Sequence, residues 1–525
     1  MKKNKYIFLL MIGLSMVGLS MTGCSDLEED PVGLLSPDGF FQTTTDIQTA
    51  VDGALTHAIN EEVWGRKLSI ALMLRSDMVD LATTQTRRVE MNEHTITTDN
   101  EMVYDPWTRI WLGISAANTA ISGAEDVDVS DETKNPVTAQ AYFIRAFYYF
   151  HLVRLFGDIP YFDAPITDTE AAASVELTSE ADVYAHIISD LEYAETWLPE
   201  TVASRAIPSK GAASSYLALV YLTMAGNDSG SEYWQMAFDK AEEVINNATT
   251  YEIALDDDYQ TLFNANKIDA SNEPIFALDY NNVEADDNAY DQTAPMTGVR
   301  GDMSDYDDDS DDNDGGWSVA VPAMAVYNSF DAADYRTGVC FQTEAMINDE
   351  IVDYTEFTNS GNSAALNQPY IAKYTRYPGE YAKSNKRATS HNYSMLRYAE
   401  VLLIAAEAAV EIGDNASALT YVNMVRERAR RGGESTSGGY EEVTVAASSV
   451  PADLTGTVTV ADVLEERRIE LAFECKRWYD IKRRQLGDEV FSASGYEGEK
   501  PYWSSSEDYD TPFPEDETAV NANLN

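Results

Sequence analysis

The chain has 525 residues, of which 44% are hydrophobic, so it is long enough to bury a large core. Its net charge of −53, from 89 acidic and 36 basic residues, repels phosphate groups. This charge excludes a nucleic-acid-binding protein and opposes electrostatic adsorption to anionic lipids, but it is compatible with an uncharged ligand or a cationic peptide.

The N-terminal segment is predicted to be a leader. Residues 1–23 begin with basic residues and continue as an apolar run that is short for a membrane span, which is typical of a signal peptide. The run ends in Met21-Thr22-Gly23-Cys24, which resembles a bacterial lipobox; an ordinary secretory leader is the alternative. We expect lipidation at Cys24, with residues 24–41 as an acidic tether, and acyl chains would anchor the protein to a membrane.

Residues 42–249 are predicted to be helical. Apolar residues recur at helical spacing in several segments, and capping boxes are predicted at 45–48 and 179–182. A polar stretch at 82–100 interrupts the series. The predicted helices span residues 47–58, 66–81, 102–124, 137–161 and 179–198.

Two helical hairpins are predicted from alanine-rich helices that end at a glycine. The first joins residues 209–225 to 231–247, and the second joins 393–412 to 415–430. Small side chains let paired helices approach closely, as in tetratricopeptide-type repeats, although a fixed repeat period is missing. The predicted fold is therefore all-α, with degenerate helical hairpins.

Residues 464–484 are predicted to form one long helix with a wide buried face. Leu464, Leu471, Cys475 and Trp478 follow a helical spacing, and the surrounding acidic and basic residues can pair along the helix edge. Cys475 could pair with Cys340 in an oxidising compartment. Its place on the apolar stripe favours a free core thiol.

Residues 250–378 differ from the rest, being rich in Asp, Asn, Gly and Tyr, and are predicted to be a loop-rich insertion with a short strand at 273–278. The acidic run at 305–316 suggests calcium, but neither reading frame matches an EF-hand loop. A solvated acidic loop is therefore favoured. The weak calcium candidates in this run are Asp309, Asp311 and Asn313.

Three segments resemble the SusD/RagB family of nutrient-binding lipoproteins: residues 142–161 (YFIRAFYYFHLVRLFGDIPY), 397–409 (RYAEVLLIAAEAA) and 466–483 (ERRIELAFECKRWYDIKR). The resemblance implies one SusD-like body, with helical parts at 42–249 and 379–525 and a ligand-binding insertion at 250–378. It also implies a lipoprotein on the outer face of the outer membrane, and the acidic residues after Cys24 resemble the export tag of such lipoproteins.

The function implied by this resemblance is capture of an oligosaccharide and its transfer to a SusC-like TonB-dependent transporter. A RagB-like protein that captures a peptide is the alternative, and a scaffold that binds only the transporter is another. We expect no enzyme activity, because the five histidines lack metal-ligand spacing and no nucleophile or phosphate-loop motif occurs. We expect no cofactor other than a structural calcium ion.

Sugar binding needs flat apolar rings and planar polar groups, mostly presented by loops on a rigid scaffold. The resemblance implies a ligand on the loop-rich face opposite the repeats, but no binding residue of the family maps onto this chain by motif. Candidates were sought in both the insertion and the polar stretch after the second helix. They are Trp317, Tyr306, Tyr290, Tyr280, Arg300, Asn288, Asp77, Arg87, Asn92 and Tyr104.

Overall fold

The computed structural model describes residues 37–280, 291–299, 316–347, 350–357, 366–379, 389–437 and 441–524. The chain divides into two units, Met1–Gln42 and Thr43–Asn525. The described part of the first unit contains the short helix α2 (Pro37–Phe40), and all further elements belong to the second. Within these described ranges, no helix is both long and apolar enough to cross a bilayer.

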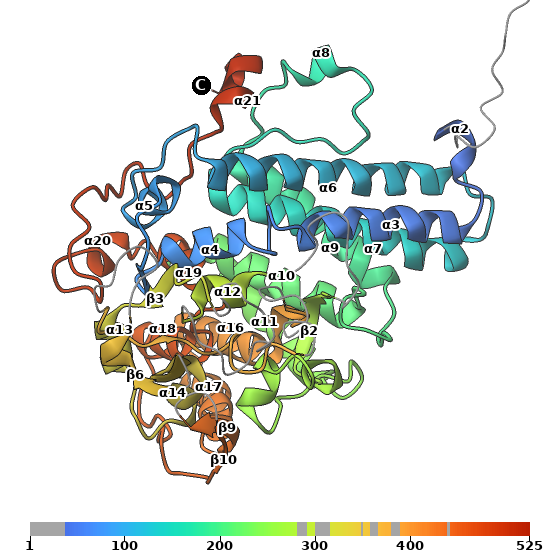
Figure 1. Cartoon of the computed structure of the whole chain (residues 1–525). Helices are drawn as coiled ribbons and strands as arrows, with labels where there is room; N and C mark the ends of the chain where they lie inside the picture. Colours follow the sequence, from blue (N-terminus) through green and yellow to red (C-terminus); the bar gives the residue numbers. More distant parts are fainter. Residues whose placement is uncertain are drawn as a thin grey trace, which may run out of the picture. The chain divides into compact units, whose positions relative to one another are not determined.

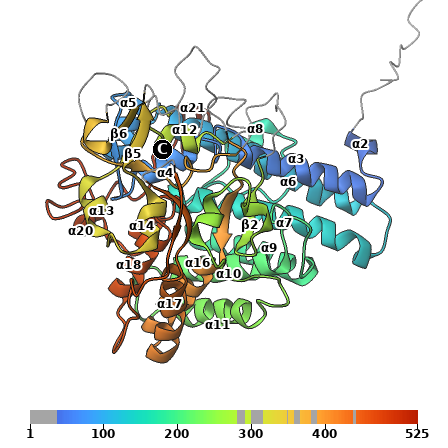
Figure 2. The same ribbon diagram turned by 60° about the horizontal axis from the view of Figure 1, so that its bottom comes forward.

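Helices packed in series form the framework of the second unit (Figures 1 and 2). They pack as the pairs α3/α6, α7/α9, α10/α11 and α16/α17, and each pair contacts the next. The predicted all-α fold with degenerate hairpins is therefore confirmed. The helices are α3 (Thr44–Ile59), α6 (Glu101–Glu125), α7 (Asp131–Phe156), α9 (Glu180–Trp197), α10 (Lys210–Ala225), α11 (Tyr233–Asn246), α16 (Tyr398–Glu411) and α17 (Asn415–Ala429).

Local signals decide where these helices begin and end. Thr43 and Asp46 form the capping box of α3, with the Thr43 amide 2.7 Å from the Asp46 carboxylate. This box begins two residues before the predicted one, because Asp46 reciprocates with Thr43. Gly226 and Gly413 have φ values of +59° and +81°, which glycine adopts without strain, so the chain can turn from α10 into α11 and from α16 into α17.

The described strands form short antiparallel pairs, and two of these pairs join the insertion to other parts of the chain. β2 (Pro274–Leu278) confirms the predicted strand and pairs with β8 (Tyr393–Arg397), which precedes α16. The prediction of helix for 393–397 was wrong, because a short buried apolar run fits either structure. The other pairs are β1 (Val79–Leu81) with β3 (Ala320–Pro322), β4 (Phe341–Gln342) with β7 (Tyr370–Ile371), β5 (Glu344–Ile347) with β6 (Glu350–Asp353), and β9 (Gly433–Ser437) with β10 (Glu441–Val445).

Short helices fill the connections. The predicted helix at 66–81 is shorter in the structure: α4 ends at Leu74 and the chain then enters β1. The polar stretch at 82–100 contains α5. The short helices are α4 (Lys67–Leu74), α5 (Thr86–Asn92), α8 (Thr169–Ala172), η1 (Tyr259–Phe263), η2 (Ile268–Ala270), α12 (Thr293–Thr297), α13 (Met324–Ser329), α14 (Tyr335–Cys340), η3 (Tyr354–Glu356), α20 (Gly487–Val490), α21 (Glu515–Val520) and η4 (Ala522–Leu524).

The segment 464–484 is not one helix. It contains most of α18 (Val460–Glu470) and all of α19 (Arg477–Arg483), separated by a turn in which Phe473 and Cys475 have φ values of +63° and +59°. The predicted apolar stripe is buried as expected. The charged residues predicted to pair along the helix edge, including Arg467 and Glu470, are buried as well. The turn allows Glu470 and Glu474 to contact the same basic groups.

A buried ion cluster surrounds this turn. The Glu470 carboxylate accepts hydrogen bonds from Arg336 at 3.0 Å, from Arg397 at 2.6 Å and from Arg428. The neighbouring carboxylates bind the same arginines. Arg397 also contacts Glu273 at 2.7 Å and Glu474 at 2.8 Å, Arg428 contacts Glu273 at 2.7 Å, Arg336 contacts Glu466 at 2.5 Å, and Lys373 contacts Glu474 at 2.7 Å.

The cluster keeps its carboxylates ionised. Burial alone would raise the pKa of Glu470, but Arg428, Arg397 and Arg336 outweigh burial and hold that pKa far below its ordinary value. Cys340 and Cys475 are both free and buried, as favoured from the sequence. Burial raises the pKa of the Cys340 thiol to about 11 and that of the Cys475 thiol to about 12.

Replacing Arg428 with Met should strongly destabilise the protein, because two buried carboxylates, Glu273 and Glu470, each lose a cation. Breaking a buried ion pair by removing one partner costs about 3–5 kcal/mol. The free energy of unfolding, measured by urea denaturation, should fall by that amount.

Arg431→Met is the matched control, since Arg431 lies three residues further on and its side chain is 39% exposed. Its ion pairs with Glu427 and Asp257 lie at the surface, so its removal should cost less than about 1 kcal/mol. Equal losses for the two variants would contradict the assigned role of the cluster.

Candidate functional site

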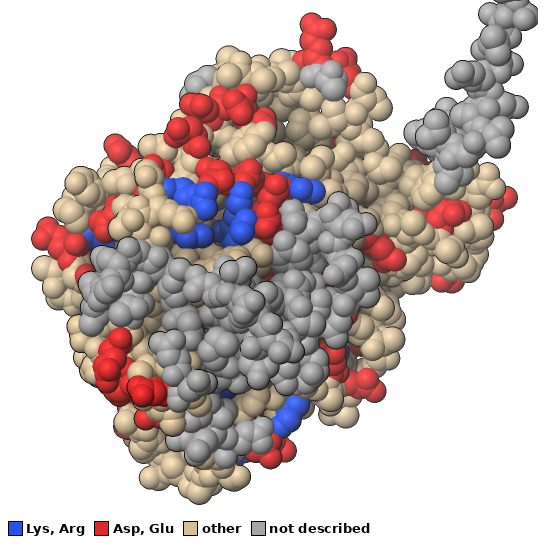
Figure 3. Space-filling model, in the orientation of Figure 1, with Lys and Arg blue, Asp and Glu red and all other residues tan. Residues whose placement is uncertain are grey.

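A polar face is formed where α4, α5 and the start of α6 meet. We call it the α4–α6 face. Figure 3 shows basic side chains gathered among acidic ones over α4 and α6, on a surface where acidic side chains otherwise predominate. The face consists of Arg66, Lys67, Arg87, Arg88, Glu101, Tyr104 and Asp105.

Asn100 holds α5 against α6. Its side-chain oxygen caps α6 by accepting from the Met102 amide at 2.8 Å, while its amide group donates to the Arg87 carbonyl at 3.0 Å and to Glu90 at 2.7 Å. Because the capping residue of α6 is bonded to α5, Arg87 lies beside Glu101, the first residue of α6, and forms an ion pair with it.

Most charges on the α4–α6 face are paired. Lys67 forms ion pairs with Asp105 and, at 3.5 Å, with Glu101, and Arg66 pairs with Glu61 at 3.0 Å. These side chains are partly exposed, so their donors and acceptors can exchange partners with a ligand. The pKa of Lys67 is lowered, first by burial and then by Arg66.

Arg88 differs from its neighbours. It is 8% exposed, and its guanidinium donates to the Met296 sulfur at 3.5 Å. Burial, followed by the charges of Arg87 and Arg66, lowers the pKa of Arg88 to about 10. Arg88 therefore lies close to other basic side chains, although the chain as a whole is strongly negative.

Trp317 is joined to this face through α12. Its backbone amide donates to the Pro295 carbonyl at 2.5 Å, and the next residue of α12, Met296, contacts Arg88. The Gln292 amide, just before α12, donates to the Gly65 carbonyl at 2.7 Å, which fixes α12 against the start of α4. Trp317 is half-buried.

The structure thus brings Arg87 and Tyr104 onto one face, with Trp317 joined to it through α12. Tyr104 is 36% exposed on α6, which leaves its ring accessible. Sequence reasoning missed Arg66, Lys67 and Arg88. The signal that would have indicated them is the occurrence of two adjacent basic pairs, Arg66-Lys67 and Arg87-Arg88, in a chain with few basic residues.

Three other predicted ligand residues are buried instead. The Asp77 carboxylate is fully buried and binds Arg477 through both oxygens, at 2.7 and 2.8 Å. Asn92 donates to two backbone carbonyls and accepts from Lys500 at 2.9 Å. Tyr280 is 2% exposed. Because all three side chains are buried, the candidate site does not include them.

The remaining predicted residues lie outside the described part of the chain. They are Cys24, Asn288, Tyr290, Arg300, Tyr306, Asp309, Asp311 and Asn313. Among the residues that the structure does describe, no group of His, Cys, Asp or Glu could hold a metal ion.

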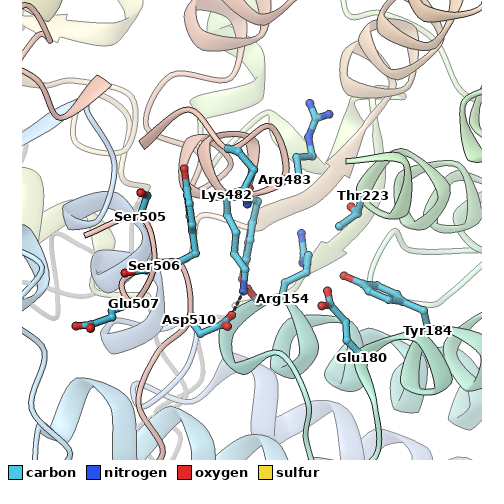
Figure 4. A pocket seen from close by; sticks show the side chains of 13 residues that line it. Arg154, Glu180, Tyr184, Thr223, Lys482, Arg483, Ser505, Ser506, Glu507 and Asp510 are labelled. Atoms are coloured by element: carbon cyan, nitrogen blue, oxygen red, sulfur yellow. Dashed lines mark hydrogen bonds and ion pairs between the residues drawn. The ribbon is translucent and has the colours of Figure 1, made fainter. Parts of the chain in front are cut away.

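Cavities also occur outside the α4–α6 face. One of about 360 Å³ is lined by Arg154, Glu180, Tyr184 and the C-terminal segment around Asp510 (Figure 4). In it Lys482 reaches Asp510 at 2.5 Å, and the Arg154 guanidinium lies 3.7 Å from the ring centres of both Phe150 and Tyr479. Another of about 400 Å³ borders Asp77 and Arg477. In the first cavity Lys482 is already paired with Asp510, and at the second Arg477 is already paired with Asp77.

Comparison with known proteins identifies close relatives. A family model described as the SusD family matches residues 345–523, and one described as starch-binding, associating with the outer membrane, matches residues 35–222. SusD-like protein P2 of Formosa agariphila is 44% identical over 530 residues, which cover 100% of this chain and 99% of that protein.

Solved structures share the fold. A SusD homolog from Bacteroides thetaiotaomicron matches with a TM-score of 0.75 and 19% identity, covering 93% of this chain and 97% of that one. Surface glycan-binding protein A from the same organism, solved in complex with laminarihexaose, matches with a TM-score of 0.71 and 20% identity, covering 92% and 98%.

The pH dependence of stability should reflect Glu497. Its side chain is 3% exposed and pairs with Lys500 at 2.8 Å; burial outweighs this pairing and raises its pKa from 4.5 to about 8. The folded protein then holds a proton that the unfolded chain releases between these pH values. The free energy of unfolding therefore falls as the pH rises through this window.

In Glu497→Gln this titration is absent. The melting temperature of the unmodified protein minus that of the variant should fall between pH 5 and pH 9. Glu499→Gln removes the same charge at an exposed position two residues away and should leave the pH profile unchanged. A difference between protein and Glu497→Gln that stays constant with pH would contradict the prediction.

Proposed function

Because this chain belongs to the SusD family, a glycan-binding family associated with the outer membrane, we propose that it is a surface lipoprotein that captures an oligosaccharide and passes it to a SusC-like TonB-dependent transporter. The observation that carries the proposal is the α4–α6 face. It combines the partly exposed ring of Tyr104 with planar polar groups on a rigid helical support, and Trp317 is joined to it through α12.

The chemistry of this face suits a sugar. The rings of Tyr104 and Trp317 can pack against the apolar C–H side of a pyranose, and Arg87, Glu101 and Asp105 can bind its hydroxyl groups. We propose that the protein acts by binding alone. The solved relative that binds laminarihexaose is consistent with an oligosaccharide of several units as the ligand.

Capture of a cationic peptide is the alternative within the same fold. The net charge of −53 favours binding of a cationic peptide to the protein as a whole. The α4–α6 face, however, carries Arg66, Lys67, Arg87 and Arg88. These basic groups would repel a cationic chain at the site itself. The local charge therefore favours the oligosaccharide.

Removing either ring should weaken glycan binding. Trp317→Ala and Tyr104→Ala are each expected to reduce the affinity about tenfold, which corresponds to about 1.4 kcal/mol, because a sugar loses its packing surface. The measurement is binding of the protein that begins at Ser25 to an oligosaccharide array, followed by titration with the best ligand.

Tyr502→Ala is the control, since Tyr502 is 64% exposed and lies outside the α4–α6 face. It should bind like the unmodified protein. The proposal fails if no oligosaccharide on the array binds, or if Trp317→Ala and Tyr104→Ala both keep full affinity.

The proposed anchor can be tested separately. Cys24→Ser should abolish metabolic labelling with a fatty acid and move the protein from the membrane fraction to the soluble fraction, since a serine cannot form the thioether to the lipid. Retention of the variant in washed membranes would argue against Cys24 as the anchor.

A further inference from the structure

The strongest unexplained feature of the α4–α6 face is the charge of Arg88. A buried guanidinium normally has an anionic partner, because removing a charge from water is costly unless the charge is paired. Arg88 is 8% exposed, and within the described part of the chain its polar contact is the weakly accepting sulfur of Met296 at 3.5 Å.

Other buried arginines of this protein have partners that compensate the cost of burying their charge. Arg145, Arg336 and Arg483 each contact a carboxylate at 2.7–2.8 Å. Arg75 and Arg154 form no such pair with a described residue, but each lies over an aromatic ring, at 3.9 and 3.7 Å, and donates to a backbone carbonyl. Arg88 has neither kind of contact among the described residues.

No residue that the structure describes supplies the missing anion. Four cations on this face, Arg66, Lys67, Arg87 and Arg88, stand against three carboxylates, those of Glu61, Glu101 and Asp105, and each carboxylate already pairs with one of the other cations. Glu90, on the same helix as Arg88, accepts from Thr97 and Asn100 instead. Within the described residues, no carboxylate therefore forms an ion pair with Arg88.

The chemistry of a guanidinium indicates which ligand would balance this charge. Its planar, forked donors match the two oxygens of a carboxylate or sulfate, and a charged partner makes such hydrogen bonds roughly twice as strong as neutral ones. Tyr104 on the same face, and Trp317 joined to it through α12, carry rings that suit a sugar ring. The bound unit would thus carry both a ring and an anion.

We propose that the α4–α6 face binds an oligosaccharide that carries carboxylate or sulfate groups, and that Arg88 receives the anion. This inference rests on the proposed glycan-binding function and specifies its ligand class. Uronic acids and sulfate esters share the chemistry that Arg88 would recognise.

The test is binding of the full-length protein, in detergent, to three sets of immobilised oligosaccharides. These are neutral glucans including laminarihexaose, uronate oligomers of galacturonic, guluronic and glucuronic acid, and sulfated oligomers of galactan and fucan. We expect binding to a member of the second or third set, and which set binds identifies the anion. Affinity should fall as salt rises from 50 to 500 mM.

Arg88→Gln should weaken this binding at least tenfold, while Arg88→Lys, which keeps the charge and loses the fork, should retain part of it. Arg109→Gln is the matched control, because Arg109 on α6 pairs with Glu62 outside the α4–α6 face. It should bind like the unmodified protein. The melting temperature of Arg88→Gln should not fall, since no carboxylate loses a partner, whereas a purely structural role for Arg88 would lower it.

The possible results separate the two proposals. Binding of neutral glucans alone, or full affinity in Arg88→Gln, overturns the anionic ligand and leaves the glycan-binding function standing. Absence of binding to all three sets overturns both.

Discussion

The buried ion cluster around Glu470 is the interaction on which the rest of the body depends. Its arginines come from α14, β8 and α17, and its carboxylates come from α18, the turn that follows α18 and the residue before β2. Charges this deeply buried are tolerated only when every partner is present. The cluster is therefore satisfied only when the insertion, the last helix hairpin and the C-terminal segment all occupy their places.

Short-range patterns predicted the helical framework well, because amphipathic helices such as α9 and α6 show their buried face within a few turns of sequence. The segment 464–484 failed for a physical reason. The spacing of Arg467 and Glu470 predicted pairing along the edge of the helix, whereas their partners Glu400 and Arg428 lie far away in the chain. Nothing within the segment indicates that these charges are buried.

The same limit applies to the candidate site. Arg87 and Tyr104 could be predicted because they flank a polar stretch between helices. Asp77 and Asn92 looked equally suitable as ligand residues. Only the fold reveals that Asp77 pairs with Arg477 and that Asn92 accepts a hydrogen bond from Lys500. Arg88 went unnoticed because an arginine in an acidic chain is expected to have a carboxylate partner, and the lack of one is visible only in three dimensions.

The two internal thiols bear on where such a protein can function. A thiol reacts with oxidants and disulfides as its thiolate, and burial raises the pKa values of Cys340 and Cys475 to about 11 and 12. At neutral pH both sulfurs are therefore protonated as well as shielded. In the folded body these two thiols are therefore poor nucleophiles, and neither takes part in a disulfide on which the fold could depend.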